Sequence, residues 1–201
     1  KVCGITNAKQ VASVAEAGAD ILGIILVEES PRAVDSETAR EIAEEAAGWG
    51  LRTVGVFADD PWEEVESLYF DLGLDIVQLH GKEAPLYVKK LVDKGLVVWK
   101  SMNVGPDFKK LKCRQFWQAG AEAVVLDAWD PELRGGTGKT CDWEVAAGLA
   151  EEGQVVLAGG LNGANVAGAI GKVRPWGIDA SSCLESEVGV KDPKKLSSYV
   201  A

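Results

Sequence analysis

The sequence contains a single histidine, His80, and none of its four cysteines forms a C-x-x-C pair. Protein zinc sites are usually built from closely spaced cysteines and histidines, so this composition argues against a zinc site. The cysteines are also too few and too far apart for the dense disulfide framework of a small secreted domain. We therefore expect no metal and a reducing compartment, with free thiols at Cys3, Cys113, Cys141 and Cys183.

Long apolar runs and an excess of positive charge are missing as well. The longest apolar stretch, 21–27, is far shorter than the roughly 18–20 residues that a membrane-spanning helix needs. There are 21 basic and 31 acidic residues, a formal net charge of −10. Nucleic-acid-binding surfaces are basic, so we expect neither a nucleic-acid partner nor a membrane. An anionic small molecule would have to be held by local donors against a repulsive overall field.

The chain opens on strand-like residues, Lys1 to Gly4, without an initiator Met and without the pattern of a signal peptide. We therefore expect a cytoplasmic protein, with a plastid as the alternative in a photosynthetic eukaryote. The missing Met indicates a start that was trimmed, or a segment excised from a longer or fused chain.

Short apolar runs alternate with amphipathic stretches along the whole chain, without a linker, and this order is typical of a parallel sheet. Eight such units favour a closed (β/α)8 TIM barrel over a doubly wound sheet of about five or six strands. We therefore predict a single compact barrel domain over residues 1–201. The predicted strands are 2–5, 21–26, 53–57, 76–79, 97–100, 123–126, 155–158 and 177–180. The predicted helices are 8–17, 36–47, 61–72, 84–94, 107–119, 142–151, 164–173 and 193–200.

Several predicted helices carry start and stop signals. Asn7 is a candidate cap for the first helix, Pro61 is expected in the first turn of the third, and Asp192 precedes Pro193 at the last. Glycines in a left-handed conformation are expected to end four helices, at Gly18, Gly73, Gly95 and Gly120.

Two residues at predicted strand ends could carry chemistry, because TIM barrels place their active residues at the carboxyl ends of strands. Cys3 belongs to the first strand and Asp127 follows the sixth. A thiol near cations can act as a base, and a carboxyl group in apolar surroundings can act as an acid because its pKa rises. For an isolated cysteine, an inert buried thiol is the commoner case. For the aspartate, capping of the following loop is as common as acid catalysis, so these residues alone do not establish a catalytic role.

Three further segments lie at strand ends. Arg32 follows the second strand, where its planar guanidinium could bind a carboxylate, although a lone surface arginine is usually just solvated. The glycine-rich segment 135–140 resembles a P-loop, but Leu133 stands where a Walker A motif needs glycine. Its glycines can still present N–H groups to an anion, and Lys139 adds positive charge.

The last two strands are followed by small residues near helix starts: Gly159 and Gly160 after the seventh, Ser181 and Ser182 after the eighth. Many barrels bind phosphate at this place through backbone N–H groups. Each pair alone is a weak signal, but their joint position predicts a phosphate site.

In their order along the chain, these motifs resemble phosphoribosylanthranilate isomerase, the barrel family of tryptophan biosynthesis. The resemblance spans the chain through segments 1–6, 30–32, 77–81, 126–127, 135–140, 159–162 and 179–182. Related phosphate-binding barrels share the late glycines, but not Cys3 together with Asp127.

The resemblance implies a cofactor-independent Amadori rearrangement of a small anionic substrate, N-(5-phosphoribosyl)anthranilate, to an open-chain 1-deoxyribulose derivative. It implies Asp127 as general acid, Cys3 as general base and Arg32 as the ligand of the anthranilate carboxylate. By the same resemblance, His80, Lys139 and Asp179 line the substrate site. The phosphate ligands would be Gly135, Gly136, Gly159, Gly160, Ser181 and Ser182.

The chain departs from the family pattern at Cys183, where glycine is usual. If that position needs a positive φ or space for phosphate, cysteine weakens binding; alternatively, the loop adjusts and the Michaelis constant rises. Two other functions stay open: the related histidine-pathway isomerase, which Cys3 argues against, and a phosphate-binding barrel with weakened or lost activity. Segment 72–80 resembles fused versions of the enzyme, so we also expect fusion to, or association with, other tryptophan-pathway domains.

Overall fold

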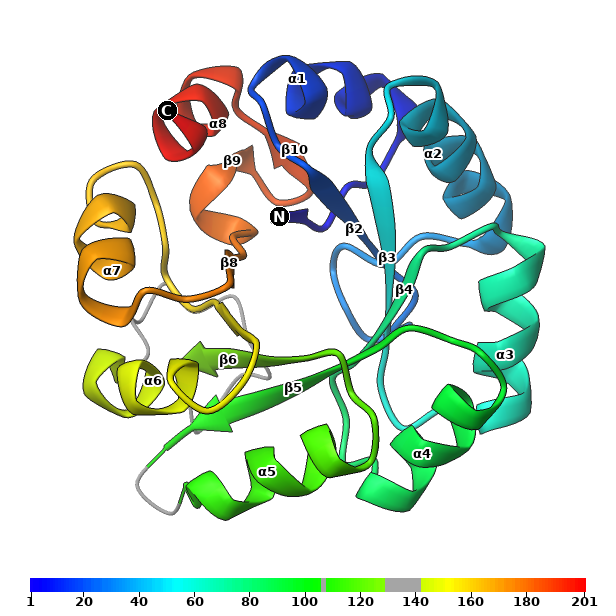
Figure 1. The fold of residues 1–201 in the computed structure, drawn as a ribbon. Coiled ribbons are helices and arrows are strands. Elements are labelled where there is room, and N and C mark those ends of the chain that lie inside the picture. Colours follow the sequence, from blue (N-terminus) through cyan, green and yellow to red (C-terminus); the bar gives the residue numbers. More distant parts are fainter. Residues whose placement is uncertain (106–107, 129–141) are drawn as a thin grey trace.

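The computed structural model describes residues 1–105, 108–128 and 142–201. Eight parallel strands follow one another in sequence order, each hydrogen-bonded to the next. The ring closes because Val2 forms a parallel bridge with Ala180, and the Cys3 N–H donates to the Ala180 carbonyl over 2.9 Å. Helices surround these strands when the molecule is viewed along the barrel axis (Figure 1). The predicted (β/α)8 barrel is therefore confirmed.

The strands and helices alternate as predicted. The barrel strands are β1 Val2–Cys3, β2 Ile21–Ile25, β3 Arg52–Phe57, β4 Ile76–Leu79, β5 Val98–Val104, β6 Ala123–Ala128, β7 Val155–Leu157 and β8 Gly177–Ile178. The helices around them are η1 Ala8–Gln10, α1 Val11–Glu16, α2 Ser36–Gly48, α3 Trp62–Asp71, α4 Pro85–Asp93, α5 Lys110–Gln118, α6 Trp143–Ala150, α7 Val166–Val173 and α8 Pro193–Val200.

Helix ends follow the predicted glycines closely. The four glycines all have positive φ values: 91° at Gly18, 63° at Gly73, 90° at Gly95 and 98° at Gly120. A left-handed residue ends a helix at little cost only when it lacks a Cβ, so these positions stop the helices and return the chain to the barrel.

The predicted helix starts are confirmed only in part. Asp192 caps α8, where its carboxylate accepts from the backbone N–H groups of Lys194 and Lys195. The cap assigned to Asn7 is wrong, because that side chain makes no capping hydrogen bond and the first turn is a 3₁₀ helix. Pro61 stands just before α3 and not in its first turn.

Apolar side chains form two layers on either side of the barrel wall. The larger layer lies between the strands and the helices. The smaller layer fills the inside of the barrel, so the barrel is a packed core, as TIM barrels generally are. Its buried members are Cys3, Val54, Val56, Ile76, Trp99, Ala123, Val125, Val156 and Ala158.

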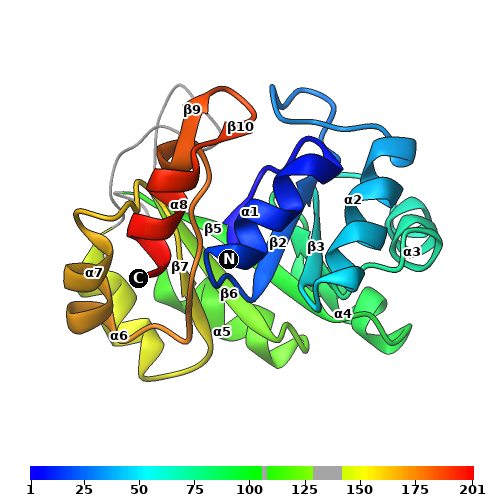
Figure 2. The same cartoon turned by 90° about the horizontal axis from the view of Figure 1, so that it is seen from above.

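One element was not predicted. After β8 the chain forms a short 3₁₀ turn, η2 Ser182–Leu184, and then the antiparallel pair β9 Glu185–Glu187 and β10 Val190–Lys191. This hairpin rises at the same end of the molecule as the loop between β2 and α2 (Figure 2). That end holds the carboxyl ends of the barrel strands, where the candidate site lies.

Within the described ranges, none of the helices is both long and apolar enough to span a membrane.

Candidate functional site

Cys3 is the last residue of β1 and points into the barrel, where its side chain packs with the inner apolar layer. It is 7% exposed and its thiol is free. A Cβ added to Gly23 on the neighbouring strand would lie 2.6 Å from the Cys3 sulfur. Glycine in β2 therefore provides the space that the thiol occupies.

Asp127 lies near the end of β6, and its Oδ1 accepts from the Ala128 backbone N–H over 2.7 Å. Burial raises the pKa of this carboxyl group, whereas His80 and the Ala128 N–H act in the opposite direction. The net shift favours the protonated form that a general acid needs. The structure thus brings His80, predicted from the end of β4, close enough to act on Asp127.

Asp179 and Lys1 form an ion pair inside the same end of the barrel. The Lys1 Nζ donates to Asp179 Oδ2 over 2.6 Å, and the two side chains are only 1% and 8% exposed. Asp179 and Lys1 each act electrostatically on both Cys3 and Asp127. The predicted acid, the predicted base and Asp179 therefore share one electrostatic environment.

Burial also raises the pKa of Cys3, while Lys1 and Lys191 oppose that rise. The thiol form is thus favoured more strongly than for an exposed cysteine. These two cations favour the thiolate that a base requires, but the net shift of the Cys3 pKa is upward and favours the thiol.

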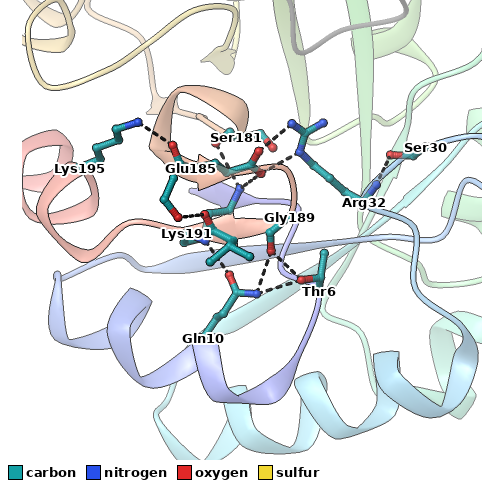
Figure 3. Close-up of polar contacts among 11 residues, drawn as sticks. Thr6, Gln10, Ser30, Arg32, Ser181, Glu185, Gly189, Lys191 and Lys195 are labelled. Atoms are coloured by element: carbon teal, nitrogen blue, oxygen red, sulfur yellow. Dashed lines mark hydrogen bonds and ion pairs between the residues drawn. The ribbon is translucent and has the colours of Figure 1, made fainter.

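Arg32 is held by a carboxylate of the protein itself (Figure 3). Its Nε and Nη2 donate to the two oxygens of Glu185, each over 2.7 Å. The Lys191 Nζ donates to the same carboxylate over 2.7 Å. Burial would raise the pKa of Glu185, but Arg32 and Lys191 hold it below its ordinary value. Arg32 therefore lies at the predicted place with one edge of its guanidinium occupied.

The hairpin that carries Glu185 is fixed to the segment after β1 (Figure 3). The Thr6 Oγ1 and the Gln10 Nε2 donate to the Gly189 carbonyl over 2.7 and 3.0 Å. The Lys191 backbone N–H in turn donates to the Gln10 side chain over 3.0 Å. The hairpin thus joins the last strand of the barrel to the first at the end where the site lies.

The predicted phosphate ligands after β7 and β8 lie in turn conformations. Gly159 and Gly160 have φ values of 84° and 63°, which side chains with a Cβ rarely adopt. The Gly160 carbonyl accepts from Asn165 Nδ2 over 2.9 Å. Since carbonyl and N–H point opposite ways in a trans peptide, this turns the Leu161 N–H away from α7. The Ser181 hydroxyl is buried with no hydrogen-bond partner among the described residues.

The predicted ligands Gly135, Gly136 and Lys139 lie outside the described residues. Among the residues that are described, no group of three or more histidine, cysteine or acidic side chains could hold a metal ion.

Cys183 does not have the backbone conformation that makes glycine necessary. It lies within η2, and among the described non-glycine residues only Asp59 and Arg174 have a positive φ. The expectation that cysteine strains this turn through a positive φ is therefore wrong.

Sequence reasoning missed the charged residues that surround the predicted ones, chiefly Lys1, Glu185 and Lys191. A second buried pair supports the turn after β4: the Lys100 Nζ lies 3.1 Å from Glu83 Oε2 and donates to the carbonyls of Leu79 and Gly81. The position of Lys1 could have been predicted from the sequence. Residues two apart on a strand share a face, and Lys1 lies two positions before Cys3.

Fold and site together define a TIM-barrel protein with a thiol, a carboxyl group of raised pKa and buried cations at the carboxyl ends of its strands. The family model described as N-(5'phosphoribosyl)anthranilate (PRA) isomerase matches residues 1–201. The chain therefore belongs to the N-(5'-phosphoribosyl)anthranilate isomerase family.

Individual relatives agree with this assignment. An N-(5'-phosphoribosyl)anthranilate isomerase of Pelobacter propionicus is 40% identical over all of this chain and 92% of its own length. The crystal structure of the Thermus thermophilus enzyme aligns with a TM-score of 0.86 and 32% identity, covering 99% of this chain and 94% of that one. A third enzyme, solved with reduced 1-(o-carboxyphenylamino)-1-deoxyribulose 5-phosphate, aligns with a TM-score of 0.82 and 29% identity over 99% and 94%.

Proposed function

We propose that the chain isomerises N-(5-phosphoribosyl)anthranilate to 1-(2-carboxyphenylamino)-1-deoxyribulose 5-phosphate, a step of tryptophan biosynthesis. The family match over residues 1–201 supports the reaction. The observation that carries the mechanism is the common setting of Cys3 and Asp127, because the charges of the same buried pair, Lys1 and Asp179, act on both.

Asp127 acts as the general acid in the first step. Its proton passes to the ring oxygen of the ribose while the bond between that oxygen and C1 breaks, and the nitrogen electron pair forms the Schiff base. The raised pKa of Asp127 supports this role because the carboxyl group must hold its proton until the ring opens.

Cys3 acts as the base in the second step. Its thiolate removes the proton from C2, and the electron pair of the broken C–H bond forms a double bond between C2 and C1. The C1–N double-bond pair returns to the nitrogen, which gives an enolamine. Transfer of the hydroxyl proton from the enol to C1 then gives the ketone. One proton leaves Asp127, one is taken up by Cys3, and exchange with solvent restores both groups after product leaves. Electron pairs shift only within the substrate, so the proposed chemistry calls on no cofactor.

The substrate's two anionic groups have separate partners. We assign the phosphate to the N–H groups of the turns at Gly159–Gly160 and Ser181–Ser182, together with Gly135 and Gly136. We assign the anthranilate carboxylate to Arg32, on the edge of its guanidinium that Glu185 leaves unoccupied. His80, Lys139 and Asp179 complete the site around the ribose.

A turnover assay tests these assignments. Purified wild type should isomerise phosphoribosylanthranilate, Cys3→Ala should abolish turnover and Asp127→Asn should reduce it strongly, by about 10²–10⁴-fold for the loss of an acid or base. Cys113→Ala is the matched control, because Cys113 is buried outside the barrel interior, on α5. Normal turnover by Cys3→Ala would contradict the assignment of Cys3 as the base.

The same assay decides between the alternatives. Turnover of the larger histidine-pathway substrate in place of phosphoribosylanthranilate would favour the related isomerase, and no turnover of either would favour an inactive phosphate-binding barrel. The single-domain organisation, cytoplasmic location and association with other tryptophan-pathway domains stay predictions.

A further inference from the structure

Lys1 is a buried cation that the reaction steps above do not use. It lies two residues before Cys3, so the alternation of side chains along a strand directs both toward the inside of the barrel. Its side chain is 1% exposed, and its Nζ donates to Asp179 Oδ2 over 2.6 Å. An ammonium group has three donors, and Cys3, buried on the same side of the strand two residues further on, acts on the Lys1 charge in the same direction as Asp179.

A gain in stability does not by itself explain this ion pair. Burying two charges costs several kcal/mol per ion, and apolar side chains of similar volume often do as well or better. The second oxygen of the same carboxylate, Asp179 Oδ1, is buried without a hydrogen-bond partner among the described residues. The cluster that fills the inside of the barrel is apolar, with members such as Val54 and Val156. A charged pair at this place therefore calls for a functional reason.

We propose that Lys1 is a positioning residue for the base, and that its ammonium, held by Asp179, stabilises the thiolate form of Cys3. This inference rests on the proposed function, in which Cys3 is the base. As Cys3 takes the C2 proton, the S–H bond forms and the C2–H bond breaks, while Lys1 keeps its own proton throughout.

The charges around Cys3 single out Lys1. Burial raises the pKa of the thiol, and Lys1 is the strongest group acting against that rise, ahead of Lys191 on β10. Asp179, after β8, adds to the rise. Arg32, in the loop after β2, and Lys191 both face Glu185, which offsets their charge.

The inference is tested by titrating the Cys3 thiol without substrate. The Cβ resonance of Cys3 is followed by NMR against pH in protein labelled with isotope-enriched cysteine, and Cys3→Ser identifies the resonance. Lys1→Gln should raise the pKa of the thiol by about one unit or more, a roughly tenfold loss of thiolate below the pKa. Lys9→Gln, at an exposed position of η1, is the matched control and should leave the titration unchanged.

Asp179→Asn is the second variant, and we expect it to shift the pKa of the Cys3 thiol in the opposite direction. Without its carboxylate, the Lys1 charge acts on the thiol unopposed, so the pKa of Cys3 should fall. A purely structural role of the pair would not produce opposite shifts from its two halves.

The inference is overturned if folded Lys1→Gln, checked by circular dichroism, titrates like Lys9→Gln. If Lys1→Gln does not fold, Asp179→Asn decides alone, and an unchanged or raised thiol pKa overturns the inference. If wild type is inactive but the thiol pKa shifts as predicted, the proposed function is wrong and the role of Lys1 stands. If wild type is active but the thiol pKa does not shift, the role of Lys1 is wrong and the proposed function stands.

Discussion

At the residue scale, the site depends on small residues as much as on reactive ones. A Cβ on Gly159 would lie 2.6 Å from the Ala128 nitrogen and 3.0 Å from Asp127 Oδ1. A Cβ on Gly23 would lie 2.6 Å from the Cys3 sulfur. Each reactive group therefore faces a position where a side chain would displace it. Since a displacement of about 1 Å can cost a hundredfold in rate, the proposed roles of Cys3 and Asp127 require glycine at both positions.

Cys183 should be an adaptation that leaves function intact. Because its φ is not positive, Cys183→Gly gains no relief of strain and adds freedom to the unfolded chain. We expect its free energy of unfolding in urea to fall by roughly 0.5–1 kcal/mol, with the Michaelis constant unchanged. Cys183→Ala keeps the Cβ and should match wild type in both measurements. A tenfold lower Michaelis constant in Cys183→Gly would instead show that the cysteine obstructs the phosphate.

At the scale of elements, the β9–β10 hairpin fastens the end of the barrel to its beginning. Two cations from different elements, Arg32 and Lys191, meet on Glu185, whose side chain is 4% exposed. Removing one partner of such a buried network leaves the others uncompensated. The hairpin therefore holds its place through charged contacts and through the hydrogen bonds of Thr6 and Gln10, and none of its residues belongs to the apolar clusters.

Glu185→Gln should destabilise the protein by roughly 3 kcal/mol at neutral pH, because Lys191, which is buried, and Arg32, which is partly buried, lose their counter-ion. The folded-state pKa of Glu185 lies below its ordinary value, so its stabilisation is complete above the unfolded pKa, about 4.3. It is lost as pH falls through the folded pKa. Denaturant unfolding against pH should show the difference from wild type shrinking below about pH 4.

The control for this prediction is Glu187→Gln, on the same strand and exposed. It should change the free energy of unfolding by less than about 0.5 kcal/mol. Two results would contradict the stabilising role of Glu185: an equal loss of unfolding free energy in both variants, or a difference between Glu185→Gln and wild type that stays unchanged in acid.

The elements also show where prediction from the sequence succeeds. The barrel strands were identifiable because both faces of the sheet are buried, which gives short, continuous apolar runs such as 123–126. The positions of Cys3 and Asp127 at the ends of β1 and β6 were also predicted, whereas their roles in the reaction stay predictions. The hairpin was missed because its strands are two and three residues long and largely polar. The Arg32–Glu185 contact joins residues 153 positions apart, and no local pattern encodes that distance.

At the scale of the whole molecule, the two ends of the barrel differ in the kinds of side chain that they hold. The charged and reactive side chains gather at the carboxyl ends of the strands. At the opposite end, Trp99 near the start of β5 is 1% exposed, and its Nε1 donates to Glu122 Oε2 over 2.7 Å. Its ring meets Trp176 edge-on at 5.7 Å. This division matches the general pattern in which one face of the barrel serves catalysis and the other stability.

Trp99→Ala should therefore separate stability from activity. Loss of this buried ring should lower the free energy of unfolding by roughly 3–5 kcal/mol, measured by circular dichroism in urea. Below its melting temperature, the folded variant should keep the kcat of wild type, since the packing it loses lies at the far end of the barrel from Cys3 and Asp127. Trp49→Ala is the matched control: Trp49 follows α2 and is 46% exposed, so about 0.5 kcal/mol or less should be lost. A large fall in kcat for Trp99→Ala with little loss of stability would show that the two ends of the barrel are coupled.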